Sequence, residues 1–331
     1  MTNLSGQMNM ISFHSRTLLA RSLGILLLAH PLRAADAPSG TPGGWDSAQA
    51  KGKHVLYFTK SSGYEHSVVK RPAGGGLSFS EQILTDLGKE HGFGVTCTKD
   101  GTVFTPENLV QYDVIVFYTS GLLTEAGTDK TPPMTLAGKT ALLNAIQGGK
   151  GFVGIHAASD SFHHQPDPPD RSARYVAYGD DIDPYLGMLG AEFIKHGAQQ
   201  RARIIVTDPQ FPGCAPLQDS FALFEEWYTF KDFRPDLHVI LAQDTQGMKG
   251  VDYQRAPYPD TWARRNGRGR VFYTAMGHRE DVWTNPLFQR LLLGGLGWAA
   301  GNLEADVTPN IVKVTPGYRQ IQPPEEPKKK P

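Results

Sequence analysis

The sequence predicts an α/β protein with a mostly parallel sheet and helices on both faces. Three observations lead to this fold class. Short apolar runs alternate with helix-like segments, an order of elements that favours a parallel sheet. Glycine-rich turns separate these segments. The chain of 331 residues is long enough to bury a large core, so we expect one principal domain.

The first half of the chain supplies the clearest alternation. Residues 55–58 predict the first strand. Ser78 and Glu81 have the spacing of a capping box, which predicts the start of a helix with one apolar face. The other elements expected here are strands at 95–98, 113–118 and 152–155 and a helix over 137–147 that ends at two glycines.

The second half is less regular, and its strands are recognised by β-branched and aromatic residues. We expect strands at 203–206, 226–230, 239–242 and 269–274. Pro286 begins a final helix, which runs to about residue 300 with leucines on its apolar face.

The charge balance and the missing motifs exclude several classes of protein. Lysine plus arginine number 33, as do aspartate plus glutamate, so there is no electrostatic case for nucleic acid as the main partner. Neither a phosphate loop nor a dinucleotide-binding glycine motif follows the first strand, so we expect no nucleotide cofactor. Cys97 and Cys214 form no C-x-x-C pair, which excludes a cysteine-rich zinc knuckle and leaves one disulfide open.

Both ends of the chain differ in composition from the middle. Arg16 and Arg21 precede the apolar residues 23–29, so we interpret residues 1–35 as a secretory signal peptide. The apolar run is too short to span a bilayer, which predicts export to the periplasm or beyond without stable membrane insertion. The alternative is a wrongly assigned start codon followed by a disordered leader. The other divisions are a linker at 36–52, one domain at 53–301, and a C-terminal extension at 302–331 with a disordered, lysine-rich end.

Three histidines follow predicted strands, and they are the main candidates for chemistry. His156 comes directly after the strand at 152–155, while His66 and His278 lie in loops that follow the first and last strands. Ligands bind at the carboxyl ends of strands in open α/β sheets, and parallel strands bring these ends to one edge. Three imidazoles at that edge can hold a divalent metal or serve as acid, base and electrophile. For any one of them, a buried histidine bonded to a backbone carbonyl is the alternative.

Two further segments carry side chains that suit the same site. His196 is either a fourth member of the site or a surface residue. Glu225 and Glu226 stand beside aromatic residues, where a carboxylate can have a raised pKa and carry a proton, or bind a sugar hydroxyl. For Glu226 the alternative is a strand-edge charge exposed to water.

Polar and aromatic residues near the histidines suggest a sugar-sized ligand. Tyr64 and Asp160 can exchange hydrogen bonds with a polyol, and Trp227, Tyr228 and Trp262 can supply flat faces for a sugar ring. Aromatic residues on strands more often belong to the core, which is the competing interpretation. The pair at 163–164 precedes a proline-rich loop and is interpreted as part of a surface lid.

On these residues the chain resembles the trehalose-utilisation (ThuA-like) family. The matching segments are the loop 60–66, the run Gly-Ile-His-Ala-Ala at 154–158, Glu-Glu-Trp-Tyr at 225–228, the stretch 269–278, and Gly-Trp-Ala at 297–299. The resemblance covers residues 54 to 300. It implies a flavodoxin-like α/β sandwich, a variant of the class I glutamine amidotransferase fold.

The resemblance also bears on the reaction. Amidotransferases place a nucleophilic cysteine at the strand-to-helix turn where this chain has His156, so thiolate chemistry on glutamine is not expected. The family's link to disaccharides implies a small carbohydrate partner, with a sugar oxidised at carbon three as the substrate. A zinc-like divalent metal held by His66, His156 and His278 would polarise the keto group, while Glu226 moves the proton. The rivals are metal-assisted hydrolysis and a secreted carbohydrate-binding protein with a degenerate site; the oligomeric state stays open.

Overall fold

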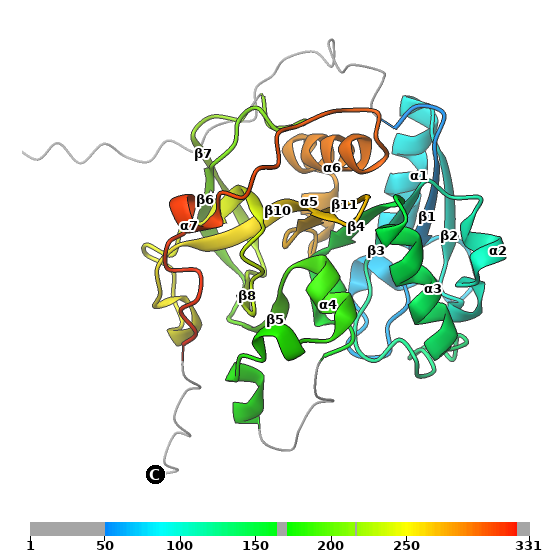
Figure 1. The fold of residues 1–331 in the computed structure, drawn as a ribbon, viewed down its shortest axis with the longest axis horizontal. Coiled ribbons are helices and arrows are strands. Elements are labelled where there is room, and N and C mark those ends of the chain that lie inside the picture. Colours follow the sequence, from blue (N-terminus) through cyan, green and yellow to red (C-terminus); the bar gives the residue numbers. More distant parts are fainter. Residues whose placement is uncertain (1–49, 164–170, 216, 323–331) are drawn as a thin grey trace, which may run out of the picture. The chain divides into compact units, whose positions relative to one another are not determined.

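The computed structural model describes residues 50–163, 171–215 and 217–322. The predicted signal peptide, most of the linker and the lysine-rich end lie outside the described residues. A nine-stranded mixed sheet in the order β2-β1-β3-β4-β11-β10-β9-β6-β7 forms the framework of the described part (Figure 1).

Five strands make the parallel half of the sheet and correspond to five predicted strands. They are β1 (His54–Phe58), β2 (Gly94–Thr98), β3 (Val114–Phe117), β4 (Gly151–Ile155) and β11 (Gly269–Thr274). Each runs parallel to its neighbours within this half. The second strand lies at the edge, and the third is added on the other side of the first, which is the flavodoxin-like order. The α/β fold class expected from the sequence is confirmed.

Antiparallel strands extend the sheet beyond β11. These are β10 (Tyr258–Asn266), β9 (His238–Gln243), β6 (Gln200–Val206) and β7 (Ser220–Glu225). A separate two-stranded sheet pairs β5 (Glu192–His196) with β8 (Tyr228–Lys231). The sequence pattern missed β5, β7 and β10. In β10, a proline, an aspartate and two arginines interrupt the apolar alternation, and the pairing with β9 contains register shifts.

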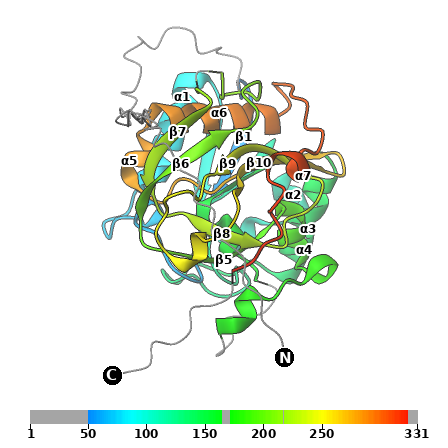
Figure 2. The same cartoon turned by 90° about the vertical axis from the view of Figure 1, so that its left-hand side faces the viewer.

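Helices cover both faces of the sheet, as predicted. The buried side chains of β1 alternate between the two faces, because successive residues of a strand point in opposite directions. Val55 and Tyr57 belong to the core beneath α1 (Phe79–His91) and α6 (Pro286–Ala299). Leu56 and Phe58 belong to the core on the other face. That second face carries α2 (Pro106–Leu109), α3 (Leu136–Gln147) and α4 (Pro184–Leu189), and Figure 2 shows the two sets of helices on opposite sides.

The predicted helix boundaries follow from local chemistry. Ser78 Oγ accepts the backbone N–H of Glu81, and the Glu81 carboxylate accepts the backbone N–H of Ser78, so the capping box at the start of α1 is confirmed. The helix α3 ends at the predicted glycines, the second of which has a positive φ of 124°. Two short helices, α5 (Glu280–Trp283) and α7 (Ile311–Val314), complete the set. Within the described ranges, no helix has both the length and the apolar character to cross a membrane.

Candidate functional site

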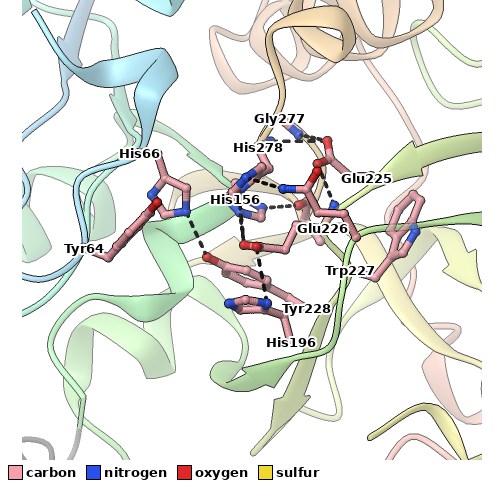
Figure 3. Close-up of polar contacts among 12 residues, drawn as sticks. Tyr64, His66, His156, His196, Glu225, Glu226, Trp227, Tyr228, Gly277 and His278 are labelled. Carbon is pink, nitrogen blue, oxygen red and sulfur yellow. Dashed lines mark hydrogen bonds and ion pairs between the residues drawn. The ribbon is translucent and has the colours of Figure 1, made fainter. Parts of the chain in front are cut away.

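Four side chains meet at the carboxyl edge of the parallel strands. His66, His156 and His278 come from the loops after β1, β4 and β11, and Glu226 follows the end of β7. One candidate ligand atom from each residue lies within 4.8 Å of those from the other three (Figure 3). Parallel strands share this edge, which explains how histidines far apart in the sequence come together.

His156 directly follows β4 and is the first residue of the short 3-10 helix η3 (His156–Asp160). Its φ of 45° is uncommon for a residue other than glycine, so the backbone here is strained and held by its surroundings. The ring is fully buried, and its Nδ1 lies 2.6 Å from the carbonyl oxygen of Ala275. Because a carbonyl can only accept, Nδ1 carries the proton and Nε2 keeps its lone pair. Burial lowers the pKa of His156, so the ring is neutral near pH 7.

His66 is also buried and neutral. Burial lowers its pKa well below the usual value, and the neighbouring His156 and His278 lower it further. The ring centroid of His66 lies 5.0 Å from that of His156 and 5.1 Å from that of His278. The Tyr228 hydroxyl stands 3.4 Å from His66 Nε2.

His278 is oriented from both sides of its ring. The side-chain amide of Gln199 lies 2.9 Å from His278 Nε2, while the oxygen of the same amide accepts a hydrogen bond from Arg279. Arg279 can only donate, so it directs the NH₂ of Gln199 towards the histidine. On the other side, His278 Nδ1 lies 3.1 Å from Glu226 Oε2. Burial opposes protonation of His278, but the Glu226 carboxylate outweighs it and raises the pKa of this residue.

Glu226 is an ionised carboxylate among three histidines. Its oxygens lie 3.5 Å from His156 Nε2, 3.1 Å from His278 Nδ1 and 3.3 Å from His196 Nδ1. Burial would raise the pKa of Glu226, but His156 and His278 hold it well below the usual range. The raised pKa considered for Glu226 from the sequence is therefore wrong, and so is the alternative of a charge exposed to water, since Glu226 is buried. A carboxylate of such low basicity suits a ligand better than a base.

Glu225, the other carboxylate considered from the sequence, supports the site directly. Its buried carboxylate accepts the backbone N–H groups of Glu226, Gly277 and His278 at 2.8, 3.0 and 3.2 Å. Burial raises the pKa of Glu225 to about 7. Glu225 thus ties the end of β7 to the loop that carries His278.

A cavity of about 450 Å³ opens beside this cluster. Its wall includes His66, Glu226, Tyr64, Asp160, Tyr228 and His196. Tyr64 is 68% exposed, whereas Tyr228 is buried with its ring centroid 4.0 Å from that of His156. The volume lies within the range typical of small-molecule sites, which is roughly 300 to 1,000 Å³.

His196 belongs to the wall of the cavity and stands apart from the cluster of four. Its side chain is 42% exposed, and its ring stacks on Tyr228 at a centroid distance of 5.9 Å. The contact with Glu226 links it to the site. His196 is therefore both partly exposed at the surface and in contact with the site.

The predicted ligand contact of Trp227 is wrong. This residue is fully buried, and its indole N–H donates to the Gln200 carbonyl at 2.8 Å. Trp262 is likewise in the core, stacked on Tyr273. Glu226 and Tyr228 line the cavity, and the residue between them points the other way because directions alternate along an extended chain.

His163 was expected in a surface lid, and the structure corrects this. Its side chain is only 11% exposed and bridges two carboxylates, with Nε2 2.5 Å from Asp160 Oδ1 and Nδ1 2.9 Å from Glu192 Oε1. Burial opposes its charge, but Asp160 and Glu192 outweigh burial and raise the pKa of His163 to about 9. The next histidine and the proline-rich loop lie outside the described residues. Glu192 was missed because β5 itself carries no clear strand pattern.

The donor set of the cluster fits a divalent metal. Each of the three histidines has a buried ring nitrogen without a hydrogen-bond partner among the described residues: His66 Nδ1, His156 Nε2 and His278 Nδ1. Two of these nitrogens, His156 Nε2 and His278 Nδ1, face the Glu226 carboxylate at 3.5 and 3.1 Å, and a metal bound between them would satisfy all three groups. Neutral imidazoles with a carboxylate suit zinc and related ions. The carbonyl of Ala275 behind His156 is the type of outer contact that orients metal-binding histidines.

Comparisons with known proteins agree with this fold. A family model described as trehalose utilisation, ThuA, matches residues 54–299. A ThuA-like protein of known structure from Bacteroides uniformis is 21% identical, with a TM-score of 0.53, and the match covers 78% of this chain and 95% of that one. A second, from Parabacteroides merdae, is 18% identical, with a TM-score of 0.46 and coverage of 82% and 96%. The comparison with curated proteins gave no significant match.

Proposed function

Because the chain belongs to the ThuA family, related to trehalose utilisation, we propose that it is an exported enzyme acting on an oxidised disaccharide or glycoside. The substrate in this proposal carries a keto group at carbon three of one sugar ring. The reaction is a metal-assisted elimination or hydrolysis of the glycosidic bond.

One observation supports the proposal. One ring nitrogen from each of His66, His156 and His278 and a carboxylate oxygen of Glu226 lie within 4.8 Å of one another, beside a cavity of sugar size. His66, His156, His278 and Glu226 are the residues that would hold the metal. When bound, a divalent metal supplies Lewis-acid polarisation of a carbonyl oxygen.

The chemistry of a 3-keto sugar suits such a site. The keto group acidifies the hydrogen on carbon two, and loss of this proton allows the glycosidic oxygen on carbon one to leave. Tyr228 and Tyr64 present a hydroxyl and an aromatic face at the cavity, which would orient the sugar ring. Hydrolysis of the same bond needs a water in the cavity in place of carbon deprotonation.

The test measures metal and turnover together. Elemental mass spectrometry of the untagged mature protein should find close to one divalent metal per chain, and His156→Ala should lose it. His54→Ala is the matched control, because His54 is exposed and lies at the opposite end of a parallel strand. The metal-loaded wild type should convert the 3-keto derivative of trehalose, and His156→Ala should not.

Two results would oppose the proposal in different ways. Metal without turnover of any 3-keto glycoside would favour a carbohydrate-binding protein, a role to which the exposed Tyr64 at the cavity is suited. Absence of metal after incubation with zinc, manganese or nickel would reject the metal site. Export is tested separately, by N-terminal sequencing of the protein from a periplasmic fraction, where a start near residue 36 is expected.

A further inference from the structure

A chain of four charged groups, two buried and two half-buried, leads from the core to the cavity wall. Lys231 Nζ lies 3.5 Å from Glu192 Oε1, and the same oxygen lies 2.9 Å from His163 Nδ1. His163 Nε2 then lies 2.5 Å from Asp160 Oδ1. Lys231 is also anchored by the Val176 carbonyl, to which it donates at 2.9 Å. Cations and carboxylates alternate along the chain, and its last member, Asp160, lines the cavity.

Burial makes this chain rigid. The side chains of Lys231 and Glu192 are 1% and 3% exposed, and those of His163 and Asp160 are 11% and 17% exposed. Exposure therefore increases stepwise towards the cavity. Two cations balance two carboxylates, and this pairing makes their burial tolerable. The imidazolium of His163 thus faces a carboxylate on each side, and its hydrogen bond fixes Asp160 Oδ1.

The proposed elimination requires a base that is not also a metal ligand. The Glu226 carboxylate is enclosed by the cluster, since its oxygens lie 3.5 Å from His156, 3.1 Å from His278 and 3.3 Å from His196. Asp160 is another carboxylate at the same cavity, and it lies outside the cluster of four. We propose that Asp160 is the catalytic base that takes the proton from carbon two of the keto sugar, and that His163, held by Glu192 and Lys231, is its positioning residue. This inference rests on the proposed function.

The elimination step balances without any further reactant. Asp160 accepts the proton from carbon two, and the electron pair of the broken C–H bond forms the double bond between carbons one and two. The bond from carbon one to the glycosidic oxygen breaks, and its electron pair leaves on that oxygen. Protonated Asp160 then returns the proton to the departing alkoxide. The products are an unsaturated keto sugar and the leaving sugar with a free hydroxyl group, with no net change in redox state or proton number.

Asp160→Asn is the first variant to test. We expect kcat on a 3-keto disaccharide to fall by ~10²- to 10⁴-fold, the usual contribution of a general base, with KM changed only a few-fold. Metal content should match wild type, while the thermal midpoint should fall because the ion pair between Asp160 and His163 is lost. The isotope effect with substrate deuterated at carbon two should increase, because proton removal becomes fully rate-limiting. The matched control is Asp86→Asn, on the exposed side of α1 and part of a surface ion pair, which should behave as wild type.

Two more variants separate a catalytic role from a structural one. Asp160→Glu keeps a carboxylate but displaces it, so it should retain more activity than Asp160→Asn; it also decides the question if the asparagine variant does not fold. His163→Gln should lower kcat and increase the isotope effect in the folded, metal-loaded enzyme. The thermal midpoint should fall in either case, but a purely structural His163 would leave kcat and the isotope effect of the folded, metal-loaded variant unchanged.

The failure of this inference is distinct from failure of the proposed function. Wild-type enzyme that contains metal but converts no 3-keto glycoside would overturn both. If the wild type is active and Asp160→Asn has the same kcat, the role of Asp160 alone would be overturned. Another group at the cavity would then be the base.

Discussion

His163 should make the stability of the folded protein fall as the pH rises above neutrality. The folded state holds an imidazolium whose pKa is about 9, because Asp160 and Glu192 outweigh the effect of burial. In the unfolded chain a histidine has a pKa of about 6.5. A pKa raised by folding stabilises the protein fully below pH 6.5, and this stabilisation is lost as the pH rises through 9.

The magnitude follows from the size of the shift. One pKa unit corresponds to about 1.4 kcal/mol, so the shift of His163 corresponds to about 3 kcal/mol of the free energy of unfolding. Urea unfolding of the chelator-treated protein at pH 6 and pH 9.5 measures the loss. His163→Gln lacks the titrating group, so wild type should lose about 3 kcal/mol more than this variant over the same range. Other groups that titrate, such as Glu225, are common to both proteins and cancel in the comparison.

Two measurements would refute this reasoning. Equal pH dependence of unfolding in wild type and His163→Gln would mean that the imidazolium contributes nothing to stability. Nitrogen NMR of the imidazole measures the pKa of His163 directly. A signal that titrates near pH 6.5 would contradict the geometry in which His163 bridges two carboxylates. The exposed-histidine variant His54→Gln serves as the control and should follow the wild-type slope.

Three other perturbations test the site and its frame. In Glu225→Gln, an amide nitrogen replaces an oxygen that accepts backbone N–H groups, so the loop that carries His278 loses a hydrogen bond. We expect the free energy of unfolding to fall by about 1–3 kcal/mol and the metal affinity to decrease. Unchanged metal affinity would contradict this. Trp227→Ala should lower the free energy of unfolding, measured in urea, by about 3–5 kcal/mol. A variant with unchanged stability but an altered KM would contradict the position of Trp227 in the core. Acidification should release the metal, because protons compete with it for the histidine nitrogens, and His278, whose pKa is raised, should be protonated first. Metal content that does not change between pH 7 and pH 4 would argue against histidine ligands.

Much of the parallel half was predictable because its signals are local. The strands at β1, β3 and β4 are short apolar runs bounded by glycine or polar turns, and the capping box marks α1. The meeting of His66, His156 and His278 also followed, since the carboxyl ends of parallel strands share one edge.

The rest depends on packing that no local pattern encodes. The chain from Lys231 to Asp160 exists only because β5 and β8 pair as a separate small sheet, which places Glu192 opposite Lys231. Tryptophan is a residue type that often stacks on sugars, but the direction of the Trp227 side chain depends on where β7 ends and β8 begins. The strand predicted over residues 226–230 begins at Tyr228 instead, so Trp227 belongs to the connection between the two strands.

The distribution of the four cluster residues over the chain has a consequence for folding. They lie at positions 66, 156, 226 and 278, and β11, which carries the last histidine to the cluster, pairs directly with β4. Contacts between such distant positions form late, because long loops must close first. A nascent or truncated chain that lacks β11 would therefore have an incomplete ligand set. Metal would bind only the completed fold, so binding of an ion would add to the stability of correctly folded molecules alone.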